Sequence, residues 1–462
     1  MSTYNVFERT TRHAIDFLES LPTRPVAAQA TAAELRQALD KPLTDSGVPP
    51  EVVIDELVHD VDRGLLASAG GRFFGWVIGG GLPAAVAADW LTSAWDQNAT
   101  IYACGPAAAV VEEITGQWLK ELLGLPADAS FAFVTGCQMA HVTALAAARH
   151  RLLASQGWNV EERGLPGAPP IRVLTSSQRH ESLIRAVRLL GMGSECIQYV
   201  PSDEHSRIRV DALAEILGRS PDAPTVVWLQ AGDLNTGTFD PFNQACDIAH
   251  THGAWVHIDG AFGLWVAASD QYRHLLEGVE KADSWATDGH KWLNVPFDSG
   301  MVFVAHPDAH RASLSTTASY LVTADDAARD QINWTPEWSR RSRGFAVYAA
   351  LRSLGRQGVA QLIERCCAHA HRLVTEIGTL PGAEVLAEPQ VNQGLVRFLS
   401  VDGDHDRRTD EVIENIRSKG VAWFGGTTWN GMRAMRVSVC NWRTKDDDVT
   451  QTIDSVRKII TQ

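Results

Sequence analysis

The stretch "TVVWLQAGDLNTGTFDPFNQACDIAHTHGAWVHID", residues 225–259, decides the fold of this chain. Residues 225–230 form an apolar run of strand length, and residues 242–253 repeat apolar side chains at helical spacing. Residues 254–259 are apolar again until an aspartate ends the run. Strand, helix and strand at this spacing predict a βαβ unit, whose two strands pair in parallel.

The same alternation continues on both sides of this unit. Apolar runs of strand length start at residues 131, 171 and 196, each followed by a helix-like run, and a last apolar run covers residues 300–305. We therefore expect an α/β fold in which a mostly parallel sheet, with helices on both faces, occupies roughly residues 125–305.

Three parts are predicted along the chain. Residues 1–75 form a helical arm, residues 76–345 a large domain that contains the sheet, and residues 346–462 a small α+β domain in which long helices surround shorter strands. The segment "ASAGGRFFGWVIGGG" at 67–81 cannot be a regular helix, because each glycine costs a helix about 1 kcal/mol.

Composition and charge argue against several kinds of partner. The 462 residues have a formal net charge of −14, which disfavours nucleic acid or an anionic membrane as the partner and favours a small molecule. The N-terminus lacks the features of a secretory signal, and no uninterrupted apolar stretch is long enough to span a membrane. Seven scattered cysteines without a C-x-x-C pair fit reduced thiols in a cytoplasm, so neither disulfides nor a metal site is expected.

Four residues stand at the carboxyl ends of predicted strands, where open α/β sheets bind ligands. Gly136 opens a helix whose free N–H groups would face an anion. His180 follows the next strand, Asp259 ends another, and Lys291 lies in "SWATDGHKWLNVPFDSGMVFV", residues 284–304. Taken alone, each has an ordinary explanation: a turn glycine, a packing histidine, a core salt bridge and a surface lysine.

Together the four residues predict one kind of chemistry. A carboxylate at the end of a buried strand is costly unless it meets a cation such as a protonated ring nitrogen. Because burial lowers the pKa of an amine, we expect a lowered pKa for Lys291, which favours Schiff-base formation. An anion site, a stacking imidazole, a carboxylate and a lysine are what pyridoxal phosphate requires, since its protonated ring accepts electrons.

The sequence resembles the group II pyridoxal-phosphate-dependent amino acid decarboxylases, the family of the aromatic-amino-acid and glutamate decarboxylases. The strongest match is the His-Lys-Trp signature in "DGHKWLNVPFDSG", residues 288–300. Further matches, in the same order as in the family, are "GRFFGWVIGGGLPAAVAADWLTSAWDQN" (71–98), "GPAAAVVEEITGQWLKELLGLP" (105–126), "SSQRHESLIRAVRLLGMG" (176–193), "HIDGAFG" (257–263) and "MRVSVCNWRTKDDDV" (435–449).

The resemblance implies a fold, a reaction and an assembly. The fold is that of the PLP-dependent transferases (fold type I), with a mostly parallel seven-stranded sheet and a smaller C-terminal α+β domain. The reaction is decarboxylation of an L-amino acid to the amine and carbon dioxide with pyridoxal 5'-phosphate, as in a carboxy-lyase. A cytoplasmic homodimer is expected, because enzymes that resemble this one build each site from both subunits.

The resemblance also implies a role for each residue around the cofactor. Lys291 is the lysine that carries the cofactor, with His290 beside it. Asp259 holds the ring nitrogen, while Ala261 lies against one ring face and His180 stacks on the other. The phosphate is bound, mainly through backbone N–H groups, by Gly136, Cys137 and Gln138.

Tyr320, in "STTASYLVTADDAARD" at 315–330, matches a tyrosine that the family carries on a mobile loop over the active site. Members with phenylalanine at this position tend to produce aldehydes, so Tyr320 favours simple decarboxylation. Tyr320 or His180 would return a proton to the α-carbon after carbon dioxide leaves. The alternative is a loop aromatic that only packs.

Three positions depart from the family pattern. Cys137 and Gln138 replace small hydroxyl residues, which leaves the phosphate to the backbone. Asp288 replaces an asparagine, and because a second anion would repel a phosphate, we expect its side chain to point elsewhere. Asp233, in "AGDLNTGTFDP", stands where a neutral amide is expected and could affect the substrate side.

The substrate is the least determined part of the prediction. The bulk of Phe73, Phe74 and Trp76 favours an aromatic or large apolar side chain, although these residues could equally pack in a dimer. Arg72 in the same segment would suit an acidic side chain. Arg436, on the apolar run "AMRVSV", could bind a substrate carboxylate or be structural.

Two kinds of alternative remain open. An aminotransferase, an aldolase-type lyase or an oxidative deaminase would use the same lysine and ring partners. A non-catalytic dimeric scaffold would keep the fold without the chemistry.

Overall fold

The computed structural model describes residues 4–316 and 328–461. The chain divides into two compact units, and each is described by itself. The large unit comprises residues 81–368 and 389–393. The small unit comprises residues 1–80, 369–388 and 394–462.

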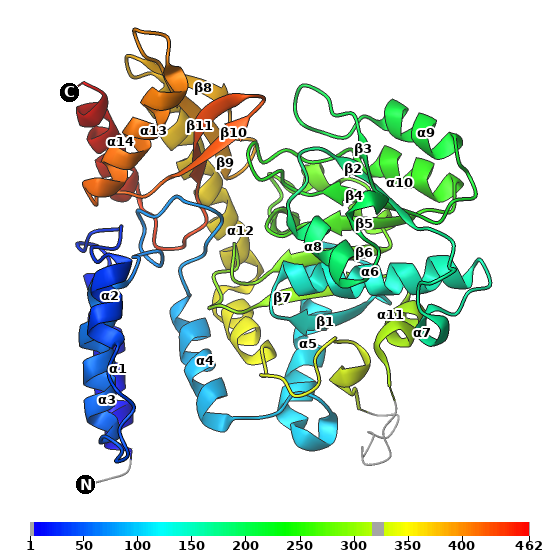
Figure 1. Cartoon of the computed structure of the whole chain (residues 1–462), viewed down its shortest axis with the longest axis horizontal. Coiled ribbons are helices and arrows are strands. Elements are labelled where there is room, and N and C mark those ends of the chain that lie inside the picture. The colour runs from blue at the N-terminus through cyan, green and yellow to red at the C-terminus, as the bar shows by residue number, and fades with distance from the viewer. Residues whose placement is uncertain (1–3, 317–327, 462) are drawn as a thin grey trace. The chain divides into compact units, whose positions relative to one another are not determined.

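The large unit is built on a seven-stranded sheet with the order β1-β7-β6-β5-β4-β2-β3 (Figure 1). Strands β2 to β6 pair in parallel, whereas β7 runs antiparallel to both β1 and β6. The predicted fold class, a mostly parallel seven-stranded sheet, is confirmed. The strands are β1 (Ser130–Val134), β2 (Arg172–Ser176), β3 (Ile197–Val200), β4 (Thr225–Gln230), β5 (Trp255–Asp259), β6 (Ser284–Asp288) and β7 (Gly300–Val304).

Helices cover this sheet, which explains why its strands read as continuous apolar runs. Every residue of β1, β4, β5, β6 and β7 is buried. Helix α6 follows β1 and packs against β5, β6 and β7 (Figure 1). The helices that belong wholly to this unit are α4 (Pro83–Trp95), α5 (Pro106–Leu123), α6 (Cys137–Ala154), α7 (Val160–Arg163), α8 (Ser182–Leu189), α9 (Val210–Gly218), α10 (Phe242–Thr251) and α11 (Pro307–Leu314).

The small unit contains a four-stranded sheet with the order β10-β11-β9-β8. Strands β8 and β9, and strands β10 and β11, pair antiparallel, and helices α13 and α14 pack together. Residues of both units contribute to α12 (Gly344–Gly378). The small unit's elements are α1 (Asn5–Ser20), α2 (Ala32–Leu39), α3 (Pro50–Val61), β8 (Ala383–Ala387), β9 (Gln393–Phe398), α13 (His405–Ser418), β10 (Gly425–Trp429), β11 (Met432–Ser438) and α14 (Asp446–Ile460).

The register of the large sheet places polar side chains at and near the carboxyl ends of its parallel strands. Asp259 at the end of β5 lies opposite Ala286 in β6, and His257 lies opposite Ser284. Because side chains alternate along a strand, His257 and Asp259 project from the same face of β5. No helix among residues 4–316 and 328–461 is long and apolar enough to cross a bilayer.

Candidate active site

Asp259 is a buried carboxylate at the carboxyl end of β5. Its Oδ1 accepts a hydrogen bond of 3.2 Å from the backbone N–H of Ala261, and its Oδ2 lies 3.4 Å from His141 Nε2. Burial alone would raise the pKa of this carboxyl, but His141 first, and then His180 and Lys291, lower it well below its usual range. Asp259 is therefore ionised at neutral pH and suited to a cationic partner.

Lys291 lies in the turn that follows β6, with its Nζ 3.2 Å from Asp288 Oδ2. The prediction of a lowered pKa is wrong for this structure. Burial is the largest single influence and lowers the pKa of the amine, but the combined negative charges of Asp288 and Asp259 outweigh it, so that the pKa is raised. The amine is held as a cation and must lose a proton before it can attack a carbonyl carbon.

Asp288 does not point away from the predicted phosphate loop, and this expectation is also wrong. Its Oδ1 accepts a hydrogen bond of 2.7 Å from the backbone N–H of Cys137, and its Oδ2 lies 3.6 Å from His290 Nε2. The reason is the first turn of α6, whose N–H groups lack helical partners and attract a carboxylate. Asp288 thus joins the start of α6 to Lys291.

The turn before α6 is packed tightly against the end of the sheet. Gly136 precedes α6 with extended backbone angles, and a Cβ atom added at Gly300 would lie 2.4 Å from its Cα. A Cβ added at Gly136 would itself lie 3.1 Å from Cε1 of His290. The structure therefore brings the predicted residues Gly136 and His290 together and adds Asp288, which the sequence analysis expected to point elsewhere.

The side chains of Cys137 and Gln138 are turned to protein partners. Burial, reinforced by Asp288, raises the pKa of the Cys137 thiol well above its ordinary value, so the thiol stays protonated. The Gln138 amide donates a hydrogen bond of 3.2 Å to the carbonyl oxygen of Ser182. An anion at this turn would consequently depend on the backbone.

His180 lies at the entry to α8 with an exposed ring. Its Nδ1 accepts a hydrogen bond of 3.1 Å from the backbone N–H of Ser182, which leaves the ring proton on Nε2. His180 and Lys291 both act electrostatically on Asp259, so these three predicted residues belong to one site. An imidazole with one fixed edge and an open face suits stacking on a flat ring.

Asp233 is explained by local structure. Its Oδ1 accepts hydrogen bonds from the backbone N–H groups of Asn235 and Thr236, at 2.9 and 2.8 Å, and from the Thr236 hydroxyl at 2.9 Å. The carboxylate therefore closes the turn after β4, which is a common use of aspartate.

The predicted substrate residues belong to the small unit. Phe74 is buried against Phe424, and Phe73 stacks on Trp423, whose ring lies 4.5 Å from that of Trp76. Phe73 and Phe74 are thus core residues of that unit, while Trp76 is 51% exposed.

Two further predicted residues are Arg436 and Tyr320. Arg436 is on β11 of the small unit, opposite Gly425. Tyr320 lies outside the described residues.

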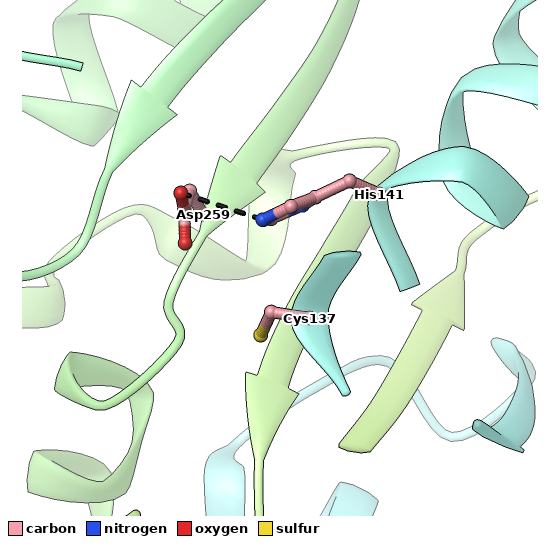
Figure 2. Close-up of side chains that lie close together, drawn as sticks. All are labelled: Cys137, His141 and Asp259. Carbon is pink, nitrogen blue, oxygen red and sulfur yellow. Dashed lines mark ion pairs between the residues drawn. The ribbon is translucent and has the colours of Figure 1, made fainter. Parts of the chain in front are cut away.

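Sequence reasoning missed His141, which Figure 2 shows pointing from α6 toward Asp259. Cys137 and His141 are one turn apart on α6, and their ligand atoms and that of Asp259 all lie within 4.8 Å of one another. Such a trio has the spacing of a metal site, and without a metal ion the Cys137 thiol is held protonated. The spacing Cys137-x-x-x-His141 was the signal that could have revealed this cluster.

The donor set fits pyridoxal phosphate. An ionised, buried carboxylate at Asp259 matches a protonated ring nitrogen, the amine of Lys291 matches an aldehyde, and the first turn of α6 matches a phosphate. These three features come from β5, the turn after β6, and α6, which meet at the carboxyl edge of one sheet.

Comparisons with known proteins agree with this chemistry. The family model described as the pyridoxal-dependent decarboxylase conserved domain matches residues 34–400. The aromatic-L-amino-acid decarboxylase of Bacillus atrophaeus is 26% identical over 455 residues, which cover 96% of this chain and 92% of that protein. The acidic amino acid decarboxylase GADL1 of Homo sapiens is 28% identical over 364 residues, which cover 77% and 69% of the two chains.

Solved structures show the same fold. The crystal structure of Oryza sativa TDC with PLP and tryptamine superposes with a TM-score of 0.92 at 22% identity, covering 100% of this chain and 98% of that one. The crystal structure of mouse CSAD has a TM-score of 0.90 at 23% identity, covering 99% of each chain. Together with the family match, the site identifies the chain as a member of the pyridoxal-dependent decarboxylase family, an amino acid carboxy-lyase whose cofactor is pyridoxal phosphate.

Proposed function

We propose that this enzyme decarboxylates an L-amino acid with an aromatic or large apolar side chain. The observation that carries this choice concerns Arg72, the residue that would match an acidic substrate. Its guanidinium donates to the main-chain carbonyl oxygens of Val421, Pro22 and Arg24, at 2.6, 3.0 and 3.2 Å, and is buried. An arginine committed to three carbonyls is a structural residue of the small unit rather than a receptor for a carboxylate.

Trp76 supports the same choice. It is the exposed member of an aromatic cluster with Phe73 and Trp423. Its role in substrate binding, like those of Phe73, Phe74 and Arg436, is a proposal that rests on the family resemblance. An exposed indole offers an apolar face to an aromatic side chain, whereas it offers nothing to a second carboxylate.

We propose that the residues at the carboxyl edge of the large sheet divide the work around the cofactor. The bound cofactor supplies a protonated ring that accepts the electrons of the breaking carbon–carboxylate bond. Lys291 holds it covalently, and Asp259 keeps its ring nitrogen protonated. Ala261 and His180 lie against its two faces.

The remaining roles concern the phosphate and the returning proton. Backbone N–H groups at the turn of Gly136, Cys137 and Gln138 bind the phosphate, with His290 beside them, and for this the Cys137 N–H exchanges the Asp288 carboxylate for a phosphate oxygen. The Nε2 proton of His180 or the hydroxyl proton of Tyr320 is delivered to the α-carbon after carbon dioxide leaves.

We also propose that residues 1–75 serve a homodimer. None of the residues in α1, α2 or α3 is buried within the single chain. Exposed apolar side chains on α1 and α3 include Phe7, Ile15, Val52, Val53 and Leu57. Helices with apolar faces and no buried residue gain stability from a partner surface, and a second copy of the chain is the partner that the family resemblance predicts. Free thiols at all seven cysteines are in keeping with the cytoplasmic location that we propose.

The substrate class is tested by competition between amino acids. The holoenzyme is given equal amounts of aromatic, large apolar and acidic L-amino acids, and each amine product is quantified. We expect the aromatic or large apolar amines to dominate, and Trp76→Ala to raise KM for these substrates more than it lowers kcat. Preferential formation of an amine that keeps a side-chain carboxylate would contradict the proposal.

Oligomeric state is tested separately by light scattering of the purified chain. A dimer is expected, and removal of residues 1–60 should yield a monomer. A monomeric full-length chain would contradict the proposed role of the arm.

A further inference from the structure

A line of buried polar side chains leads across the large sheet to Asp259. Trp255, His257 and Asp259 are alternate residues of β5 and project from one face, and Ser284 is the register partner of His257 on β6. Helix α6 lies on this face and adds His141. Strand alternation, register and one helical turn therefore bring five residues from three elements into contact.

Three hydrogen bonds and one ion-pair contact run along this line. Trp255 Nε1 donates to Ser284 Oγ at 2.8 Å, and Ser284 Oγ lies 2.8 Å from His257 Nδ1. His257 Nε2 lies 3.0 Å from His141 Nδ1. The last contact, from His141 Nε2 to Asp259 Oδ2, is an ion-pair distance of 3.4 Å.

The chemistry of these groups gives the line a direction. An indole N–H can only donate, so Ser284 Oγ accepts from Trp255 and has its own proton to give to His257 Nδ1. His257 then carries its proton on Nε2 and donates it to His141 Nδ1. His141 in turn carries its proton on Nε2, where it faces the carboxylate of Asp259.

The opposite direction is electrostatically poorer. If His257 Nδ1 donated to Ser284 and His141 Nδ1 donated to His257, a neutral His141 would turn a lone pair toward the Asp259 carboxylate. The Ser284 hydroxyl, already accepting from Trp255 and His257, would also lack its acceptor in this line. The donor-to-carboxylate direction gives Ser284 an acceptor and turns the Nε2 proton of His141 toward the Asp259 carboxylate, at the ion-pair distance of 3.4 Å.

The line is sealed from water. His141, His257 and Ser284 have no measurable exposure, and the ring of Trp228 lies 4.5 Å from both imidazole rings. Burial lowers the pKa of His257 well below its ordinary value, so this ring stays neutral. Hydrogen bonds in such a medium are stronger than in water, which makes their orientation consequential.

We propose that Trp255, Ser284, His257 and His141 form a directional relay of hydrogen-bond donors that fixes the Asp259 carboxylate for the cofactor's ring nitrogen. His141 is the positioning residue that touches Asp259, and Ser284 acts through two histidines. This inference rests on the proposed role of Asp259. It assigns a function to residues that contact neither the substrate nor the cofactor.

The relay is tested first without cofactor, by nitrogen-15 NMR of histidine-labelled protein. Both His257 and His141 should carry their proton on Nε2. Ser284→Ala should disturb both rings, whereas Ser130→Ala should disturb only His310, because Ser130 Oγ lies 2.9 Å from His310 Nδ1 in another buried pair. A proton on Nδ1 of His141, or a doubly protonated His141, would overturn the proposed direction.

The second test is the affinity of the cofactor-free protein for pyridoxal phosphate. His141→Phe should weaken binding about tenfold to a hundredfold, the range found when a partner that orients a binding group is lost. His141→Asn, which keeps an N–H donor, should recover part of the loss, and Ser284→Ala should weaken binding more than Ser130→Ala does. Equal affinities for Ser284→Ala and Ser130→Ala would refute the relay.

Two further results distinguish the relay from failure of the proposed role of Asp259 and from a metal site. If Asp259→Asn binds pyridoxal phosphate as the parent does, the proposed role of Asp259 fails, whatever the histidine tautomers are. If the cofactor-free protein takes up one Zn²⁺ and both Cys137→Ser and His141→Phe abolish this uptake, His141 is a metal ligand and the relay is refuted.

Discussion

Two buried serine–histidine pairs of the large unit begin alike and end differently. Ser284 lies 2.8 Å from His257 Nδ1, and Ser130 lies 2.9 Å from His310 Nδ1. The second ring nitrogen of His310 ends on the backbone carbonyl of Trp334 at 2.9 Å, which closes that network. The second ring nitrogen of His257 contacts His141, which leads to a carboxylate at the edge of the sheet.

The difference teaches how to tell a structural polar network from a functional one. Both histidines are fully buried, and burial lowers the pKa of both. Burial and a lowered pKa therefore do not distinguish them. The distinguishing feature is the last acceptor of each network. In the network of His310 it is the backbone carbonyl of Trp334, which is neutral. In the network of His257 it is the ionised carboxylate of Asp259, which can bind a cationic ligand.

The largest expected difference between the two networks is in catalysis. Asp259→Asn removes the charge that holds the ring nitrogen protonated, so kcat should fall about 10²-fold to 10³-fold, the cost of removing one preorganised electrostatic partner. His310→Asn should change kcat by less than about twofold, because its network ends away from the reacting atoms. Steady-state amine formation checks both variants, and circular dichroism confirms that they are folded. Similar losses of kcat in the two variants would contradict the distinction between a functional and a structural network.

The next effect is on stability at low pH. Burial lowers the pKa of His310 to about 3, so between pH 7 and pH 5 the unfolded histidine takes up a proton that the folded one refuses. Stability therefore falls as the pH falls, by about 2 kcal/mol from this histidine alone. Urea unfolding at the two pH values should show a smaller drop for His310→Asn than for the parent. An unchanged drop would show that His310 titrates normally in the folded protein.

The smallest effect concerns Lys291. Asp288 is the main cause that raises the pKa of this amine, so Asp288→Asn should lower the pKa. A larger fraction of the amine is then neutral at pH 7, and the cofactor-free variant should capture pyridoxal phosphate faster than the parent, as followed by visible absorbance. Asp298→Asn, at a residue paired with Arg343 instead, is the matched control. Slower capture by Asp288→Asn would mean that its bond to Cys137 matters more than its charge.

Much of the fold was predictable because its signals are local. The apolar runs at 225–230 and 254–259 and the periodic run between them each predict their own element, and parallel pairing follows from their order. The antiparallel placement of β7 was not predictable from such runs, since pairing direction depends on contacts between distant segments. The positions of Asp259, His180 and Lys291 were predictable because each lies at or just after the end of a strand, while their roles stay predictions.

The sequence could not show which charged side chains from distant segments come into contact. The approach of Asp288 to both Lys291 and the N–H of Cys137 depends on the packing of α6 against β6, and it reverses the expected direction of the lysine pKa. His141 was missed for the same reason, because one helical turn and one strand register must combine before it meets Asp259. Arg72 looked available to a substrate until its three carbonyl partners were located.

The most direct test of the account is the fate of the carboxyl carbon. The holoenzyme is incubated with an aromatic L-amino acid labelled at its carboxyl carbon, and labelled carbon dioxide and organic product are measured together. The account predicts one equivalent of labelled carbon dioxide for each amine formed, and neither product from Lys291→Ala. A 2-oxo acid that retains the label would contradict it and identify an aminotransferase instead.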